Sequence, residues 1–406
     1  MKRVALLCVG LSVGAASAAE AQLTMQMSNG WSFTFSGNVN AFGIYESVSD
    51  EGGTLAAPGG LIGIGGNGFT IKTGLLPAFA VFDAKGKEGN TDLGVHFGFA
   101  PQIQCGGQAH DCFGAQIDMR QVYLTVGGSW GQILAGREIG LFNRQNILTD
   151  QTLFGIGATG GIYSGGTTLG RIGFGYIYPN FVAQMTYSTP AGRPGQISIG
   201  LFQPSTLNSD VGTAYGETQV PRVEAEGTFK TGDILLWVNG TAQNAKNDVI
   251  DESKTAVGAG GGFRFGRSTF SLTGSGYWGK GIGTTLQFNG VGACDPTAGC
   301  GPVNGIGVGA DGELRTSFGF LGQITFTPAN SKLTVAGSYG SSFLQASDGE
   351  PDFKTENTLV SGGIYFQATK SLKIVGEGNY AWTKETEADT PKNSSFAPAF
   401  GLMLFF

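Results

Sequence analysis

The side chains that most often transfer protons are scarce in this sequence. It contains two histidines, His96 and His110, and neither lies beside a serine in a recognisable hydrolase motif. A serine hydrolase needs a base that is oriented toward its nucleophile, and an imidazole is the usual base. We therefore expect no enzyme. The alternative is a hydrolase that uses His96, and it would lose its activity on the change His96→Ala.

The cysteines indicate cross-links rather than metal chemistry. Four of the five form two local pairs, Cys105 with Cys112 and Cys294 with Cys300. In an exported protein such pairs are most simply interpreted as disulfides. A zinc site is the competing interpretation, but beyond His110 it would lack ligands at a suitable spacing. No metal is predicted.

Glycine-rich motifs of the kind that bind dinucleotides occur three times, beginning at Gly63, Gly155 and Gly307. At this glycine content about two GxGxxG matches are expected by chance, and none of the three opens a helical pattern. We interpret them as loop glycines, so no cofactor is predicted.

The N-terminus has the features of a secretory signal peptide. Lys2 and Arg3 precede an apolar run over 4–16, and Ala19 and Ala21 fit an A-x-A cleavage site. The run is shorter than the roughly 18 to 20 residues that a bilayer-spanning helix needs. The sequence therefore predicts two parts, a signal peptide over 1–21 and one mature domain over 22–406.

The composition suits a protein with many strands and turns. Glycine makes up 71 of 406 residues, charged residues only 13%, and no Pro-rich linker or charge block divides the chain. Removal of Lys2, Arg3 and Glu20 with the signal peptide changes the formal net charge from −6 to −7. Such an acidic chain is not expected to bind nucleic acid.

Apolar and polar residues alternate with a period of two in many segments of about ten residues. Between Trp31 and Glu46, apolar and small residues fill the odd positions, whereas the even positions include serine, threonine and asparagine. A second segment places one apolar face opposite Lys72: Phe69, Ile71, Leu75, Phe79 and Val81. Further segments follow at 92–99, 222–229 and 315–326. This pattern is typical of a transmembrane antiparallel β-barrel, an all-β fold.

The connections between these segments alternate in length, as they do between the two ends of such barrels. Tight turns are predicted at 83–90, 127–129, 230–233, 266–268, 329–332 and 370–373. Longer loops, such as 279–312 and 346–356, separate them, and both cysteine pairs fall in the long set. We count about sixteen strands, with 181–187 and 196–202 as strands and 171–178 as part of a loop.

The C-terminal segment carries a further signal. Alternate residues up to the last are mostly apolar, and they are Phe396, Pro398, Phe400, Leu402, Leu404 and Phe406. This resembles the signal by which outer-membrane barrels are recognised for insertion. Pairing of this strand with the first would leave no open edge.

One hairpin carries a resemblance to a known family. The run from Met119 to Arg137 contains Arg-Gln-Val-Tyr and ends in Gly-Arg, and it resembles a hairpin of the trimeric Gram-negative porins. The matching residues are Arg120, Gln121, Tyr123, Gly131, Gly136 and Arg137, whereas Thr125 and Val126 replace the usual glycine and leucine. The stretches 187–190 and 195–204 look like the family's Y-x-x-P motif and the strand that follows it.

The resemblance implies a homotrimer in outer-membrane lipid and a third loop, over about 138–180, that folds into the pore. Its charges would be Glu138, Arg144, Asp150 and Arg171. The inward face of the strands would supply Lys72, Asp118, Arg120, Arg222, Glu224, Glu226, Arg264, Arg315 and Glu377. Opposite charges across a narrow passage would create a transverse field that disfavours apolar solutes and sets ion preference. In a wide lumen, the same charges would only be solvated.

The expected function is therefore passive diffusion of ions and small hydrophilic solutes through a water-filled channel in the Gram-negative outer membrane. We expect a weak cation preference, although the inward charges are nearly balanced. A substrate-selective channel is the nearest alternative, with Trp237, Tyr277 and Tyr365 along its lumen. A structural or adhesive barrel would instead have a plugged lumen and no conductance.

Overall fold

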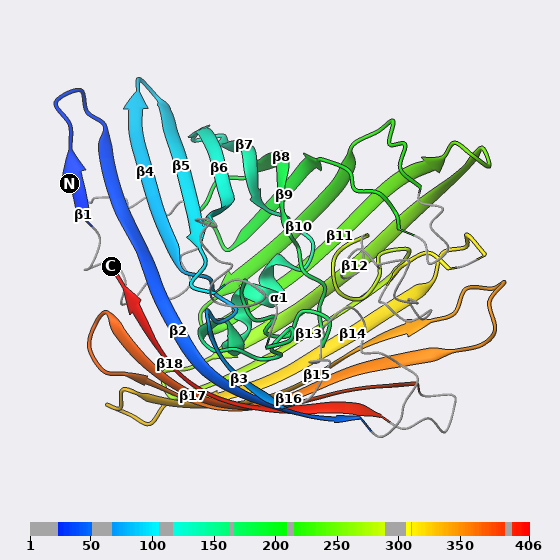
Figure 1. Ribbon diagram of the computed structural model, residues 1–406. Helices are drawn as coiled ribbons and strands as arrows, with labels where there is room; N and C mark the ends of the chain where they lie inside the picture. Colours follow the sequence, from blue (N-terminus) through cyan, green and yellow to red (C-terminus); the bar gives the residue numbers. More distant parts are fainter. Residues whose placement is uncertain are drawn as a thin grey trace.

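The strands of the computed structural model form one closed antiparallel barrel of sixteen spans (Figure 1). The structure describes residues 23–50, 67–104, 117–162, 166–208, 215–288, 306–309, 311–385 and 392–406. Each span pairs with the next, and β18 pairs with β2 from Asn393↔Asp50 to Phe405↔Asn38. This pairing closes the sheet, and the predicted fold and strand number are confirmed.

The element bounds are as follows: β1 Leu23–Gln26, β2 Ser32–Asp50, β3 Gly68–Lys72, β4 Phe79–Glu88, β5 Thr91–Pro101, β6 Ile117–Gly128, β7 Gly131–Ile139, α1 Arg144–Thr149, η4 Gln151–Phe154, β8 Phe181–Ser188, β9 Gly195–Phe202, β10 Arg222–Thr231, β11 Ile234–Asn247, β12 Glu252–Gly266, β13 Phe270–Lys280, β14 Thr316–Phe326, β15 Leu333–Gln345, β16 Lys354–Gln367, β17 Leu372–Glu385 and β18 Asn393–Phe405.

The second span is interrupted between β3 and β4. β3 pairs with one half of β2 and β4 with the other half. Over 73–78 the ladder is replaced by side chains of β2, because Asn38 donates to the Pro77 carbonyl at 3.0 Å and Asn40 donates to the Leu76 carbonyl at 2.9 Å. The Asn40 amide oxygen also accepts from the Gly74 backbone N–H at 2.9 Å.

This interruption corrects one predicted face. Phe69 and Ile71 are 64% and 55% exposed on the outer surface, as the alternation requires. Leu75 and Phe79 are buried, and Val81 packs against the same interior cluster. The period of two does not persist through the break, so the sequence pattern assigned the later residues to the wrong side of the wall.

The chain ends meet at the seam of the barrel. Phe406 and Gly37 exchange two backbone hydrogen bonds, at 2.8 and 3.0 Å. β1 continues beyond Phe406 along the same edge of β2, with Leu23 opposite Phe35. Figure 1 shows β1 and the C-terminal end on the same side of the barrel.

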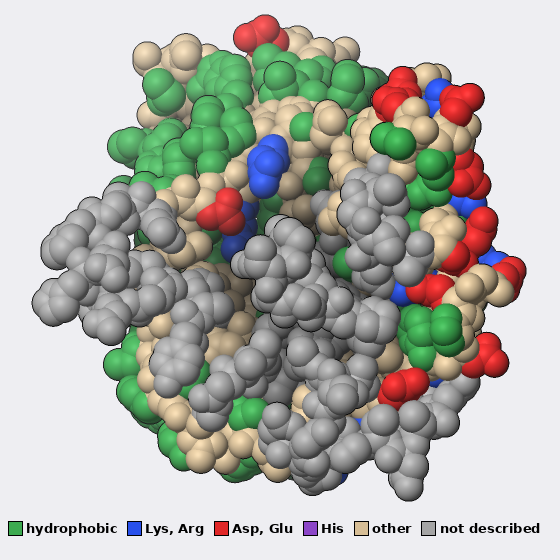
Figure 2. All heavy atoms as spheres, turned by 45° about the vertical axis from the view of Figure 1, so that its right-hand side comes forward, with side chains coloured by type: hydrophobic (Ala, Val, Ile, Leu, Met, Phe, Trp, Pro, Cys, Tyr) green, Lys and Arg blue, Asp and Glu red, His purple; other side chains and the backbone are tan. Residues whose placement is uncertain are grey.

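The two faces of the wall differ as a membrane barrel requires. Outward side chains are apolar and exposed, for example Phe400 at 62% and Ile364 at 52%. Inward side chains include buried polar groups such as Asn40 and Glu224. Figure 2 shows hydrophobic side chains over the upper left of the surface, acidic side chains along the right edge, and a hollow near the centre with charged side chains beside it.

The main apolar cluster lies inside the barrel rather than between two sheets. Phe42 and Ile44 of β2 face inward and are fully buried. They belong to one cluster with Ile156, Ile172 and Tyr176 from the long connection between β7 and β8. Burial of this apolar surface holds that connection against the wall.

The connections agree with the alternation of short and long segments. Five of the predicted tight turns coincide with gaps between strands, whereas the first is shorter than expected because β4 continues to Glu88. Residues 171–178 form no named strand, and β8 and β9 lie where strands were predicted.

Several predictions fall outside the described residues. They are the signal peptide, its cleavage site, both cysteine pairs and His110. Within the described ranges, no helix is long and apolar enough to cross a membrane.

Candidate functional site

The connection between β7 and β8, residues 140–180, contacts inward-facing side chains all around the barrel, and we name it loop L3. It contains the short helix α1 and the 3₁₀ turn η4, which Figure 1 shows within the barrel. Its hydrogen-bond partners come from β2, β10, β11, β14, β15, β16 and β17. The candidate site is the space between loop L3 and the wall.

Two buried carboxylates bind the backbone of loop L3 directly. Glu224 of β10 accepts hydrogen bonds from the N–H groups of Leu141 and Phe142, at 2.7 and 3.0 Å. Glu377 of β17 accepts from the N–H groups of Ile156 and Gly157, at 3.2 and 2.7 Å. Loop N–H groups that would otherwise lack partners are thereby satisfied. Both carboxylates were predicted as inward charges, and their role is to fix the loop.

The helix α1 is held by side chains of β10 and β11. Arg144 forms an ion pair with Glu226 at 2.5 Å, and both side chains are largely buried. The indole N–H of Trp237 donates to the Asn146 side chain at 2.8 Å. These contacts join loop L3 to the wall opposite β2, so α1 has a fixed orientation.

A second group fixes the middle of loop L3 to β2 and β3. The Lys72 ammonium donates to the carbonyls of Thr159 and Gly161, each at 3.3 Å. The Thr159 hydroxyl donates to Glu46 at 2.8 Å. Lys72 was predicted, whereas Glu46 was not. Its even position in the first predicted strand, the same as that of Asn38 and Asn40, is the signal that could have identified it.

Asp150 acts within loop L3 rather than at an open surface. It caps η4 by accepting from the Thr152 N–H at 2.9 Å, and it accepts from the Tyr176 hydroxyl at 2.7 Å. Burial, and next the nearby Asp150 charge, raise the pKa of Tyr176 well above its ordinary value, so this hydroxyl stays a donor. Arg171 is fully buried and donates to Ser338 and to the Leu359 carbonyl.

A β-bulge places Arg120 in the lumen. The pairing of β5 with β6 runs from Gly98↔Gln121 to Phe99↔Met119, so Arg120 is the extra residue. Its Nε donates to Asp118 at 2.7 Å, and its guanidinium lies 5.7 Å from the centre of the Phe181 ring. The predicted pair Asp118 and Arg120 is therefore close together, with Arg120 next to loop L3.

Of the other predicted site residues, Glu138 and Arg222 adjoin the groups that hold loop L3, whereas Arg315 and Arg264 lie farther away. Glu138 is buried and accepts from Gln121 at 2.8 Å. Arg222 lies beside Glu224 at 3.2 Å and over two phenylalanine rings. Arg315 pairs with Glu350 in the connections beyond β13 and β15. Arg264 of β12 is exposed, and it forms no ion pair within the described part of the chain.

Most inward charges are therefore buried, and those that remain accessible are mainly basic. Arg120 and Arg264 keep accessible surface, as does Lys373 of β17, whose ammonium lies 3.6 Å from the centre of the Phe154 ring. The accessible carboxylates at this level, Asp83 and Asp118, each have a basic neighbour within 2.9 Å. Sequence reasoning missed Lys373.

The predicted inward aromatic residues do face inward, but they do not form an accessible track. Trp237, Tyr277 and Tyr365 are all at least 95% buried. The Tyr365 hydroxyl donates to Glu377, and Tyr277 belongs to an apolar cluster with residues of the connection after β13. They support loops in the lumen.

The histidine of the hydrolase alternative has a carboxylate partner. His96 Nδ1 lies 2.9 Å from Asp83, and the ring stacks on Tyr123 with centroids 4.6 Å apart. Its Nε2 is buried and has no partner among the described residues, so no hydroxyl nucleophile is bound there. The described residues also contain no group of three or more acidic, histidine or cysteine side chains that would hold a metal.

Comparison with known proteins identifies what this architecture resembles. A family model described as Gram-negative porin matches residues 5–386. A search of curated protein sequences finds no match.

Among solved structures, the chain is similar to the outer membrane channel DcaP of Acinetobacter baumannii, with a TM-score of 0.65 and 15% identity over 94% of this chain and 99% of that one. The anion-selective porin from Comamonas acidovorans gives 0.61 and 12% over 93% and 100%. The trimer form of OmpT from Vibrio cholerae gives 0.53 and 12% over 93% and 100%. Identities this low establish a shared fold alone.

Proposed function

The chain belongs to the Gram-negative porin family, and we propose that the passage between loop L3 and the wall is the constriction that sets which solutes cross. The protein is an outer-membrane porin, a multi-pass β-barrel channel for passive diffusion of ions and small hydrophilic solutes. The observation that carries the proposal is the attachment of loop L3 to both sides of the lumen, through Glu224 and Glu377.

Two classes of charge have different roles in this proposal. The buried groups Lys72, Glu224 and Glu377 position loop L3, because their polar atoms bind its backbone. The accessible groups Arg120, Arg264 and Lys373 meet the solute, because each keeps exposed surface and none of them binds a buried carboxylate. Because the loop and the charges are both fixed, every solute meets the same side chains in the passage.

The ion preference that this arrangement favours is a modest preference for anions. A weak cation preference was the expectation from the sequence, in which the inward charges are nearly balanced and the net charge of −7 is concentrated in loops, and it stays untested. However, the field in a pore depends on charges along the path, and total charge in distant loops is screened within about 10 Å. The accessible charges near loop L3 are mainly basic, which supports the opposite sign.

The test is single-channel recording from purified protein in a planar bilayer with a KCl gradient. We expect stepwise openings and a reversal potential of the sign given by chloride permeation. The variant Arg264→Gln should move that potential toward zero. A reversal potential of the sign given by potassium would overturn the anion preference. Folded protein that leaves the bilayer silent would overturn the channel and favour a plugged, adhesive barrel.

We also propose that the protein assembles as a homotrimer. Arg137 of β7 pairs with Val122 and Ala183 at positions that face outward, and its side chain is exposed. A charged outward side chain is costly against lipid, by roughly 2 to 4 kcal/mol at the membrane midplane. A partner subunit at this face would remove that cost. Conductance steps in sets of three would support this assembly.

Several finer predictions complete the proposed protein. Residues 1–21 act as a cleaved signal peptide, residues 22–406 form the mature barrel, and the pairs Cys105–Cys112 and Cys294–Cys300 form disulfides. We propose no reaction for it, since family and fold point to a channel. Hydrolysis of a lipid or peptide that His96→Ala abolished would revive the enzymatic alternative.

A further inference from the structure

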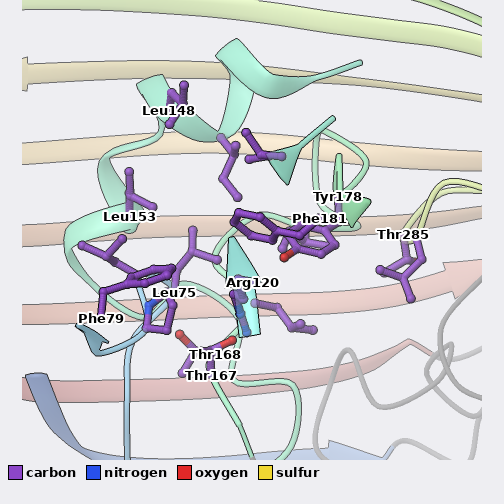
Figure 3. Close-up of a pocket in the computed structure, with 17 residues that line it drawn as sticks. Leu75, Phe79, Arg120, Leu148, Leu153, Thr167, Thr168, Tyr178, Phe181 and Thr285 are labelled. Atoms are coloured by element: carbon purple, nitrogen blue, oxygen red, sulfur yellow. The ribbon is translucent and has the colours of Figure 1, made fainter. Parts of the chain in front are cut away.

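Loop L3 and the barrel wall enclose a cavity of about 200 Å³ inside the lumen (Figure 3). The wall contributes residues from β4, β6, β7 and β8 and from the interruption at 73–78. Loop L3 contributes residues from α1, η4 and its returning arm, and the connection after β13 contributes Thr285 and Leu286. The cavity therefore lies at the proposed constriction.

The lining of the cavity is mostly apolar. Leu75 and Phe79 face it because of the break between β3 and β4, and Ile147, Leu153 and Ile172 face it from loop L3. A diffusion pore for hydrophilic solutes gains nothing from such a lining, because water and sugars require polar partners. An apolar solute, in contrast, is stabilised by burial there.

The cavity also has a polar part, with unsatisfied hydrogen-bonding groups. The hydroxyls of Thr168 and Thr285 are buried, each residue is 1% exposed, and neither oxygen has a partner within the described chain. Arg120 lines the same cavity, and the hydrogen bond recorded for it uses only Nε, which leaves donors on its terminal nitrogens. Figure 3 shows Thr167 and Thr168 on the same side as Arg120, with Leu148 and Leu153 on the other.

A buried unsatisfied hydroxyl costs stability unless a ligand or water satisfies it, so a molecule with a polar group in the cavity would gain a hydrogen bond here. An arginine with free terminal N–H groups matches a carboxylate. Burial also raises the pKa of Tyr178, so this lining phenol stays neutral and does not repel an anion.

From this geometry we infer that the cavity binds small organic anions with a compact apolar body, such as an aromatic monocarboxylate, with the carboxylate at Arg120 and Thr168 and the ring among the leucines and Phe79. This inference rests on the proposed function, because it names a solute class for the same constriction. A cavity of about 150 Å³ holds benzene, so one ring and its carboxylate suit this volume. Bulkier solutes do not.

The experiment uses the full mature protein in planar bilayers, with benzoate added to a KCl solution while the current is recorded. We expect benzoate to interrupt the current in a concentration-dependent manner. Acetate has the charge without the ring, benzyl alcohol has the ring without the charge, and both should interrupt it far less. If either compound acts as strongly as benzoate, the inferred recognition is wrong.

Variants assign the effect to the cavity. Arg120→Gln should raise the half-blocking benzoate concentration roughly tenfold or more, because a charge-assisted hydrogen bond is lost. Thr168→Val keeps the shape and should raise it several-fold, and Leu153→Trp should abolish block by filling the cavity. Lys230→Gln is the matched control, since it removes an exposed basic side chain of β10 that does not line the cavity, and it should keep the block.

The outcomes separate this inference from the channel itself. A normal KCl current that benzoate does not block would overturn the proposed binding of aromatic carboxylates in the cavity. The proposed channel function would be unaffected. An equal effect of Lys230→Gln and Arg120→Gln also overturns it, because the block would then follow the total charge of the protein and not the cavity. Folded protein with no KCl current overturns the proposed constriction as well.

Discussion

The inward carboxylates act mainly through the backbone groups that they bind. Glu377 accepts four hydrogen bonds, from two N–H groups of loop L3, from Tyr365 and from Asn379. Gly157, one of these donors, has φ of 55°, and an added Cβ would lie 2.4 Å from Gly170. The carboxylate therefore holds a backbone conformation that other residues rarely adopt.

Replacement of this acceptor should loosen loop L3. In Glu377→Gln, an N–H₂ group replaces one of the two carboxylate oxygens and the remaining acceptor is neutral, so the hydrogen bonds to the two loop N–H groups, which share one carboxylate oxygen, become weaker. We expect the free energy of unfolding in urea to fall by about 1 to 3 kcal/mol and the open-channel current to become noisier.

The matched control is Glu356→Gln. Glu356 is also a carboxylate of the wall, but it lies on the outward side of β16, opposite Phe343, and it contacts Lys384 and Thr358 rather than loop L3. Equal current noise in both variants would show that Glu377 has no special role in holding the loop.

The sequence predicted which residues face the lumen but not how far each is from open water. Parity placed Lys72, Arg222, Glu224 and Glu377 inside, and they are inside. Their burial depends on loop L3 returning against the wall, and no periodicity encodes that contact. Lys373 was missed for another reason, because it is the last residue of the predicted turn 370–373, whereas the structure places it in β17.

At the scale of elements, regular strands were predictable and irregular ones were not. β8, β9 and β18 follow the period of two and lie where the pattern places them. The break at 73–78 and the bulge at Arg120 both replace ladder hydrogen bonds by local geometry. The alternation of inward and outward side chains follows from regular hydrogen bonding between strands. A prediction from this alternation is therefore wrong where the strand pairing is interrupted.

The orientation of α1 should depend on the pair of Arg144 and Glu226. Charge reversal of either partner alone, Arg144→Glu or Glu226→Arg, replaces this ion pair by two like charges, and we expect altered conductance and lower thermal stability. The double variant restores attraction and should recover much of both properties. A double variant that behaves as the sum of the two single variants would show that the pair does not orient the helix.

At the scale of the whole molecule, the barrel is filled from within. Its largest apolar cluster joins β2, the break in the second span and loop L3, so the wall and the loop stabilise one another. The outer surface of the described chain presents mainly apolar side chains to lipid, and Arg137 is a charged exception on the face formed by β6, β7 and β8. This exception supports a protein partner at that face.

Charge reversal at this position should therefore weaken assembly. We expect Arg137→Glu to migrate as a folded monomer on unheated gels, because an acidic side chain would meet a surface that fits a guanidinium. Lys280→Glu is the control, since Lys280 is exposed on β13, and it should keep the trimer. Unchanged migration of Arg137→Glu would place the subunit contact elsewhere.

The bulge in β6 also bears on how such a channel can change its solute over generations. Loss of a residue from a strand normally turns every following side chain to the opposite face. At Arg120 the extra residue is already outside the alternation, with Met119 and Gln121 paired to consecutive residues of β5. A one-codon deletion there would remove the guanidinium from the cavity and leave both neighbouring faces in place. Descendants of this gene can thus lose or regain the cation by insertion and deletion while the barrel stays intact.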